Sequence, residues 1–161
     1  MEVLRKRIGL IRKLLIAGLV LGAFGVGYAY YLFNMPHRDV QSTEAYAELE
    51  ASELVAEFLN EAEVANQKYL DTEGESKVIV VTGQVESIEL DQNNQKVILL
   101  KQSGDRAGVS CTFTLATNLN ADNLMLGQHT SIKGVIRSGA EIDLDLDLVE
   151  DVILEKCDIV N

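Results

Sequence analysis

The sequence predicts a mainly β domain that is preceded by helices and by an N-terminal membrane span. Three features predict this fold class: an uncharged run at residues 14–33, helical apolar spacing over residues 52–71, and short β-rich segments bounded by Gly, Asn and Asp over residues 77–161. The chain has 161 residues, of which 47% are hydrophobic and one is proline. It is therefore long enough for one folded domain, and its composition excludes a disordered or collagen-like protein.

The uncharged run LLIAGLVLGAFGVGYAYYLF, residues 14–33, would span about 30 Å as a helix, which matches the hydrocarbon core of a bilayer. Residues 1–13 contain five basic residues and one acidic residue, a net charge of +4. The other residues include 9 basic and 24 acidic ones, a net charge of −15. By the positive-inside rule we expect residues 1–13 to form a cytoplasmic tail, residues 14–33 a transmembrane helix, and the acidic body to lie outside the cytoplasm.

Two alternatives concern this N-terminal segment. A cleavable signal peptide is the rival of a retained anchor, because Gly27 and Ala29 place small residues at a plausible cleavage spacing. Gly18 and Gly22 form a GxxxG pattern, which could let two helices approach closely and form a homodimer. Glycine is common in membrane helices in any case, so the pattern alone does not establish a dimer.

Residues 34–51 are expected to form a linker that contains the only proline and a possible short helix, with Tyr46 and Leu49 facing inward. An amphipathic helix is predicted over residues 52–71, with Ser52 as its N-cap and glutamates on its outer side. Its apolar positions recur at spacings of three and four, so we expect them to pack on the β domain. These positions are Leu54, Phe58, Ala62, Ala65 and Tyr69.

Five strands are predicted after this helix, at residues 78–90, 96–102, 109–115, 130–138 and 152–160, with a short helix or turn at residues 120–126. The third strand alternates strictly, which places Val109, Cys111, Phe113 and Leu115 on one face. In the last strand the inward positions 154 and 157 are an odd number of residues apart, which indicates a bulge between them.

Three strands, a helical turn and two further strands fit a five-stranded Greek-key barrel of the OB type. Gly83 and Gly134 interrupt otherwise continuous strands, where glycine usually marks a bulge or the bend that closes a small barrel. Either glycine could instead be incidental.

The chain resembles the bacterial tRNA_anti-like family in the segments ELVAEFLNEAEVANQKYL, VIVVTGQVESI, VSCTF, LGQHTSIKGVI and VILEKCDIV, and the resemblance extends over roughly residues 52–161. The resemblance implies an OB-fold domain in a short envelope protein with one N-terminal membrane segment, hence a place in the bacterial cytoplasmic membrane. The pattern includes no catalytic signature, and the family name does not imply that the chain binds tRNA.

Cys111 on the third strand and Cys157 on the fifth would be neighbours in an OB barrel, at a separation that suits a disulfide. An oxidising compartment would favour that bond, which would stabilise the fold by about 4 kcal/mol in the chain-entropy model. The alternatives are two buried thiols or, without a CxxC motif, a redox-active pair.

Carboxylates alternate with apolar residues in the segment EIDLDLDLVED, so Asp143, Asp145 and Asp147 could hold a hard cation such as calcium. The same alternation is typical of a strand with a solvated acidic face, and the EF-hand pattern fails because Leu148 and Leu154 stand where glycine and glutamate are needed. We expect the solvated face and no resident metal or cofactor.

Catalysis has little support, because only Cys111 with His129 could pair a nucleophile with a base, and that thiol is predicted to be in the core. Nucleic-acid binding is disfavoured by the −15 body and by the lack of aromatic residues other than Phe113 between residues 71 and 161. We therefore expect a non-catalytic, membrane-anchored module that binds an envelope protein or a peptide. A small-ligand or cation sensor is the first alternative, and a nucleic-acid-binding domain is the second.

Overall fold

The structure is a computed structural model that describes residues 18, 22–30, 40–71, 76–143 and 148–160. Clustering of contacts divides the chain after residue 38 into two units. In the first unit, residues 22–30 are helical. Within the described ranges, no helix is both long and apolar enough to cross a membrane. The predicted tail at 1–13 and the parts of the predicted span at 14–17, 19–21 and 31–33 lie outside those ranges, and dimerisation through Gly18 and Gly22 stays a prediction.

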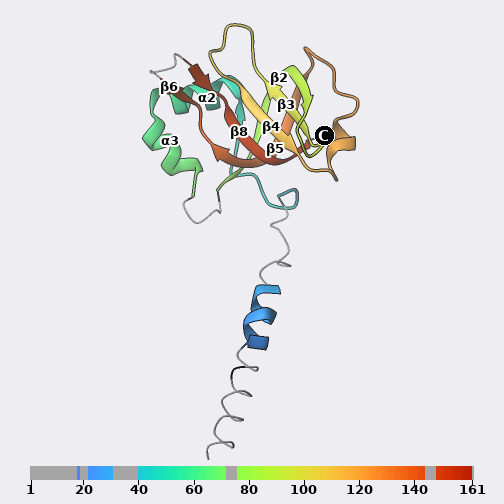
Figure 1. The fold of residues 1–161 in the computed structure, drawn as a ribbon. Coiled ribbons are helices and arrows are strands. Elements are labelled where there is room, and N and C mark those ends of the chain that lie inside the picture. Colours follow the sequence, from blue (N-terminus) through green and yellow to red (C-terminus); the bar gives the residue numbers. More distant parts are fainter. Residues whose placement is uncertain (1–17, 19–21, 31–39, 72–75, 144–147, 161) are drawn as a thin grey trace, which may run out of the picture. The chain divides into compact units, whose positions relative to one another are not determined.

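The second unit is a closed five-stranded barrel, which confirms the predicted mainly β class (Figure 1). Its elements follow the chain as β1 (Ala47–Glu50), α2 (Ala51–Asn60), α3 (Ala62–Tyr69), β2 (Val78–Leu90), β3 (Lys96–Leu100), β4 (Val109–Phe113), the 3₁₀ helix η1 (Asn118–Ala121), β5 (His129–Ser138), β6 (Glu141–Asp143), β7 (Leu148–Glu150) and β8 (Val152–Ile159).

The barrel closes because β2 is long enough to pair with two strands. Its first half pairs antiparallel with β5 and its second half with β3. β3 pairs antiparallel with β4, β4 runs parallel to β8, and β8 returns antiparallel to β5. This order is that of an OB barrel. Gly83 lies near the end of the part of β2 that pairs with β5, where it is paired with Thr130. A Cβ added at Gly83 would lie 3.0 Å from the Cβ of Ala51.

β1 corrects one expectation, because residues 47–50 form a strand instead of a helix. β1 runs parallel to β2 and pairs Ala47 with Ile79 and Glu50 with Thr82. Its exposure alternates, so that Ala47 and Leu49 pack against the core while Glu48 and Glu50 face solvent. Tyr46, which was expected to face inward, is 55% exposed. Pairing with β2 therefore overrides the helical propensity of this short, Ala- and Glu-rich segment.

The single helix expected over residues 52–71 is two helices in the structure. The backbone leaves helical geometry at Glu61, where φ is −139° and ψ is 58°, so that α2 ends and α3 begins. Leu54, Phe58, Ala65 and Tyr69 are buried in the core, but the prediction for Ala62 is wrong, because this residue at the start of α3 is exposed.

Two predictions at element ends are also wrong. Ser52 does not cap α2, because the helix starts one residue earlier and the Ser52 hydroxyl donates to Asp105 Oδ2 at 3.0 Å. Leu115 does not extend the buried face of β4, because the strand stops at Phe113 and a Thr114–Thr117 hydrogen bond turns the chain, which leaves Leu115 65% exposed.

Candidate functional site

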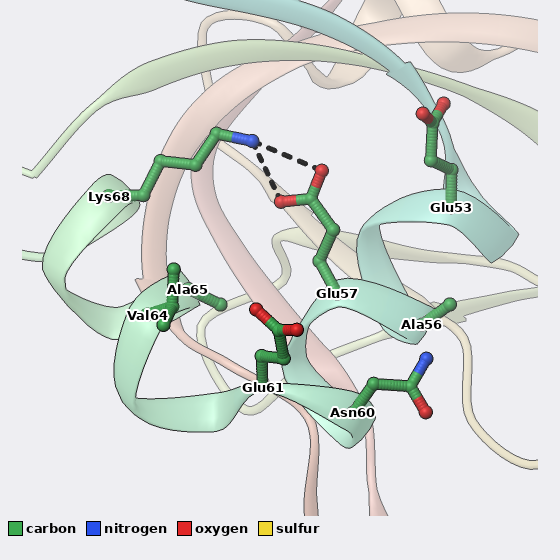
Figure 2. Close-up of a pocket in the computed structure, with 8 residues that line it drawn as sticks. All are labelled: Glu53, Ala56, Glu57, Asn60, Glu61, Val64, Ala65 and Lys68. Atoms are coloured by element: carbon green, nitrogen blue, oxygen red, sulfur yellow. Dashed lines mark hydrogen bonds and ion pairs between the residues drawn. The ribbon is translucent and has the colours of Figure 1, made fainter.

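A pocket lies between α2 and α3, beside the break at Glu61 (Figure 2). It has a volume of about 440 Å³ and is lined by residues of these two helices and by Glu61 between them. These residues are Glu53, Ala56, Glu57, Asn60, Glu61, Val64, Ala65 and Lys68. Glu53, Glu57 and Glu61 are four residues apart, which places them on one side of α2 and at its end.

The pocket depends on the break in the helix. Glu57 and Lys68 are eleven residues apart, so in one continuous helix their backbones would be about 16 Å apart along the axis. In the structure the Lys68 Nζ lies 2.8 Å from Glu57 Oε2 and 3.1 Å from Glu57 Oε1, as the dashed lines in Figure 2 show. The two helices therefore fold back on one another, and the ion pair closes one side of the pocket.

Tyr69 ties this ion pair to the core. Its ring is fully buried and its hydroxyl donates to Glu57 Oε2 at 2.9 Å, while Lys68 Nζ lies 4.6 Å from the ring centroid. Burial acts to raise the pKa of Glu57, but the hydrogen bonds from Lys68 and Tyr69 outweigh it and the pKa is lowered. The hydrogen bond to Glu57 raises the pKa of Lys68, and burial raises that of Tyr69. All three groups thus keep their ordinary charge state at neutral pH.

The electrostatics of this pocket favour a cation. Among its lining residues, three carboxylates face one lysine, and that lysine is already paired with Glu57. The last turn of α2 contains no basic residue, so the partial negative charge at the C-terminal end of the helix is uncompensated there. An ammonium or guanidinium group placed near Glu61, at the C-terminal end of α2, would meet both sources of negative potential.

A second pocket of about 470 Å³ lies between the helix pair and the β6–β7 hairpin. Phe58, Leu59 and Ile142 give it an apolar floor, and Glu141 and Glu150 line it from the hairpin. These two glutamates are directly paired across β6 and β7, and like charges in that position repel. A cation bound here would relieve that repulsion, so this pocket also favours a positively charged ligand with an apolar part.

The acidic segment of residues 141–151 does not form the single strand that the alternation suggested. It forms the hairpin of β6 and β7, with Asp143 opposite Leu148. Asp145 and Asp147 lie outside the described residues. Within the described ones, no group of three His, Cys, Asp or Glu side chains is arranged to hold a metal ion.

Gly134 lies beside Cys157 in the barrel, whereas Gly83 lies against Ala51 and Leu100. Cys111 and Cys157 are buried on the neighbouring strands β4 and β8, and both are free thiols in the structure. The predicted bulge in β8 is confirmed, because the β4–β8 register shifts between its pairs Cys111–Leu154 and Phe113–Cys157. Gly134 lies at a register shift between β5 and β8.

The outer face of β3 and β4 is the usual oligonucleotide surface of an OB fold. Here it presents the cross-strand pairs Val97–Thr112 and Leu99–Ser110, which are half-buried and uncharged. Phe113, the only aromatic residue after residue 71, is fully buried in the core. This face therefore offers neither a stacking ring nor a charged side chain at these four positions.

Comparison with known proteins agrees with this class of fold, a small closed OB-type barrel. Residues 1–146 match the family described as tRNA_anti-like, so the chain belongs to the tRNA_anti-like family, as the resemblance implied. Among curated proteins no match is found. A solved structure from Klebsiella pneumoniae subsp. pneumoniae, described as a "putative nucleic acid-binding lipoprotein", shares the fold with a TM-score of 0.51 at 16% identity, over 79% of this chain and 100% of that one.

The sequence predicted neither pocket as a site. The outer glutamates predict the solvated side of one helix, and the pattern assigns no role to Lys68. The regular spacing of Glu53, Glu57 and Glu61 was the available signal. It became a pocket only because α3 folds back toward the same side of α2.

Proposed function

We propose that this protein is a non-catalytic, membrane-anchored binding module that docks a basic peptide or protein segment on its helix pair. The observation on which the proposal depends is the charge of the two pockets beside α2 and α3. Their lining residues include five carboxylates and a single cation, Lys68, which is paired with Glu57. A segment with Lys or Arg next to an apolar side chain fits both pockets, because each combines carboxylates with aliphatic or aromatic groups.

The anchoring part of the proposal is supported by the sequence alone. The uncharged run of residues 14–33 and the basic residues before it favour a retained anchor with the barrel on the extracytoplasmic side of the bacterial cytoplasmic membrane. Protease added to intact spheroplasts is expected to digest the barrel. Protection of the barrel until the cells are permeabilised would show the opposite orientation.

A binding experiment with the full chain in nanodiscs tests the docking site. The probe is a fluorescent peptide that alternates Lys and Leu, and anisotropy is measured at physiological salt. Glu53→Gln combined with Glu61→Gln neutralises the first pocket, and Glu141→Gln combined with Glu150→Gln the second. We expect one of these pairs to weaken binding about 5- to 30-fold, as two partly exposed charges worth about 0.5–1 kcal/mol each would do.

The matched control removes two charges elsewhere. Glu86 and Glu89 are exposed on β2 and line neither pocket, so Glu86→Gln combined with Glu89→Gln should leave binding within about twofold. Equal weakening by all three pairs would mean that the net charge attracts the peptide without a site. No measurable binding of the peptide to the wild-type chain would refute the docking site directly.

Nucleic-acid binding is the competing function that the Klebsiella structure suggests by its description. The half-buried, uncharged face of β3 and β4 and the buried Phe113 give it no support in this chain. A labelled single-stranded oligonucleotide in the same assay should show no binding even at low salt. Salt-dependent oligonucleotide binding that survives neutralisation of both pockets would favour nucleic acid over the peptide. The sensor alternative is tested by adding calcium in place of the peptide and measuring the thermal midpoint of the wild-type chain.

A further inference from the structure

Three unusual features of the barrel converge on the sulfur of Cys157. The first is the bulge in β8, where Lys156 adopts a φ of 54°. In an unbroken strand, Leu154 and Cys157 would point to opposite faces because they are three residues apart. The left-handed residue between them inserts one extra position, so that both side chains are buried. The strained conformation of Lys156 therefore turns Cys157 into the core.

The second feature is Gly134 on β5, the strand on one side of β8. A Cβ at this position would lie 2.7 Å from Cys157 Sγ, which is closer than real side chains approach. Gly134 thus leaves the room that the sulfur occupies. Glycine in the interior of a strand lowers stability, so the position of Gly134 beside Cys157 indicates that the space is needed by the Cys157 side chain.

The third feature is Cys111 on β4, the strand on the other side of β8. Both cysteines are 0% exposed, and Cys157 is paired with Phe113, two residues along β4 from Cys111. The Cys111 thiol donates to the backbone carbonyl of Val109 at 3.8 Å. Burial, followed by the interaction with Cys111, raises the pKa of Cys157. A small apolar residue would fill the same space, so packing alone does not explain why both strands carry a cysteine here. A bond between the two sulfurs would explain it, because β4 and β8 are adjacent and both side chains are buried in the barrel.

We propose that Cys111 and Cys157 form an intramolecular disulfide in the exported protein. This inference adopts the extracytoplasmic location in the proposed function. The oxidant is a disulfide, of an exported oxidoreductase or of glutathione. One cysteine thiolate attacks it, forms a mixed disulfide and releases one thiol; the other thiolate then attacks the protein-side sulfur, closes the Cys111–Cys157 bond and releases the second thiol. Two cysteine protons and two electrons thus pass to the oxidant.

The exchange must happen before the barrel closes, because neither thiol is accessible afterwards. β8 is the last strand of the chain and lies between β4 and β5, so Cys157 reaches Cys111 when this strand docks. Folded, reduced protein should accordingly resist oxidation, whereas protein that refolds in the presence of the oxidant should acquire the bond.

The first test refolds the full chain in nanodiscs with oxidised and reduced glutathione. We expect an intact mass that is two hydrogen atoms lower, no alkylation by iodoacetamide after denaturation, and a thermal midpoint about 10–15 °C above that of the reduced protein. Cys111→Ala and Cys157→Ala should each abolish the difference between oxidising and reducing buffer. Two alkylated cysteines in the refolded wild type, or a bond only between two copies, would overturn the pairing.

The second test takes the protein from cells, with acid quenching and alkylation before purification. A blocked, disulfide-bonded pair is the expected result. If the bond forms on refolding in vitro but the protein from cells carries free thiols, the extracytoplasmic location is wrong and the proposal fails in the cell, while the geometry of the pair stands. The two failures can therefore be told apart.

Discussion

Substitution of Gly134 by alanine tests the packing around Cys157 most directly. The new Cβ would lie 2.7 Å from Cys157 Sγ, 3.2 Å from the carbonyl oxygen of Glu155 and 3.3 Å from the Cβ of Leu154. Comfortable contacts between such atoms are about 3.5–4.0 Å, so the sulfur must move by roughly 1 Å. Because Cys157 is completely buried, that movement forces its side chain off its rotamer or shifts β8.

Overpacking of this kind costs about 1–3 kcal/mol, and the gain from replacing a strand glycine offsets about 0.5–1 kcal/mol of it. We expect Gly134→Ala to lower the free energy of unfolding by about 1–2 kcal/mol. A double-mutant cycle with Cys157→Ala removes the clashing sulfur and should show a favourable coupling of about 0.5–1 kcal/mol. The relief is partial because the contacts with Glu155 and Leu154 remain.

The assay is urea unfolding of the full chain in detergent, with reductant present so that a disulfide does not enter the comparison. Gly25→Ala is the control, because an added Cβ there has no atom within 4 Å, and it should leave the unfolding of the barrel unchanged. A neutral Gly134→Ala, or a cycle in which the two changes simply add, would refute the close approach of β5 to the Cys157 sulfur.

Three further predictions concern the helix pair and the bulge. Phe58→Ala should lower the free energy of unfolding by about 3–5 kcal/mol because the ring is 1% exposed. Ala62→Ser should change the free energy of unfolding by no more than about 0.5 kcal/mol because Ala62 is exposed. Equal urea midpoints for the two variants would contradict this. Folding lowers the pKa of Glu57 from 4.5, so the ionised Glu57 stabilises the fold above pH 4.5, and this stabilisation is lost as the pH falls further. For a partly exposed ion pair the stabilisation is at most about 1 kcal/mol. In Glu57→Gln the free energy of unfolding should therefore depend less on pH between pH 3 and 6. Lys156→Gly should stabilise the reduced protein by about 0.5–1 kcal/mol, because glycine adopts the φ of 54° without the strain of a side chain. A lower thermal midpoint would instead show that the lysine side chain matters more than the backbone.

The barrel could be predicted from the sequence because its strands obey a simple rule. β2 has the predicted bounds, and β3, β4, β5 and β8 differ from prediction by one or two residues at their ends. Buried positions alternate in β4, and the odd spacing between Leu154 and Cys157 indicates the bulge from the sequence alone. These features are local, because they depend on which face of a strand is buried. The alternation of apolar and polar residues in the sequence indicates that face directly.

β1 could not be predicted in the same way. Its four residues have helix-forming composition, and they form a strand only because β2 offers a free edge at residues 79–82. The composition of a short Ala- and Glu-rich segment gives no sign of a pairing partner that lies about thirty residues later in the chain. Leu115 differs from its prediction for a local reason, because the Thr114–Thr117 turn ends the alternation that the pattern would continue.

The candidate site depends on one backbone irregularity that the apolar pattern conceals. Phe58, Ala65 and Tyr69 lie on one stripe whether the helix is straight or broken, so the pattern fits both cases equally well. Only the break at Glu61 brings Lys68 to Glu57 and converts a row of solvated glutamates into a pocket with one neutralised cation. The position of the break thus distinguishes this pocket from an ordinary acidic helix, and variants that straighten or shift it are expected to abolish the proposed peptide binding before they unfold the barrel.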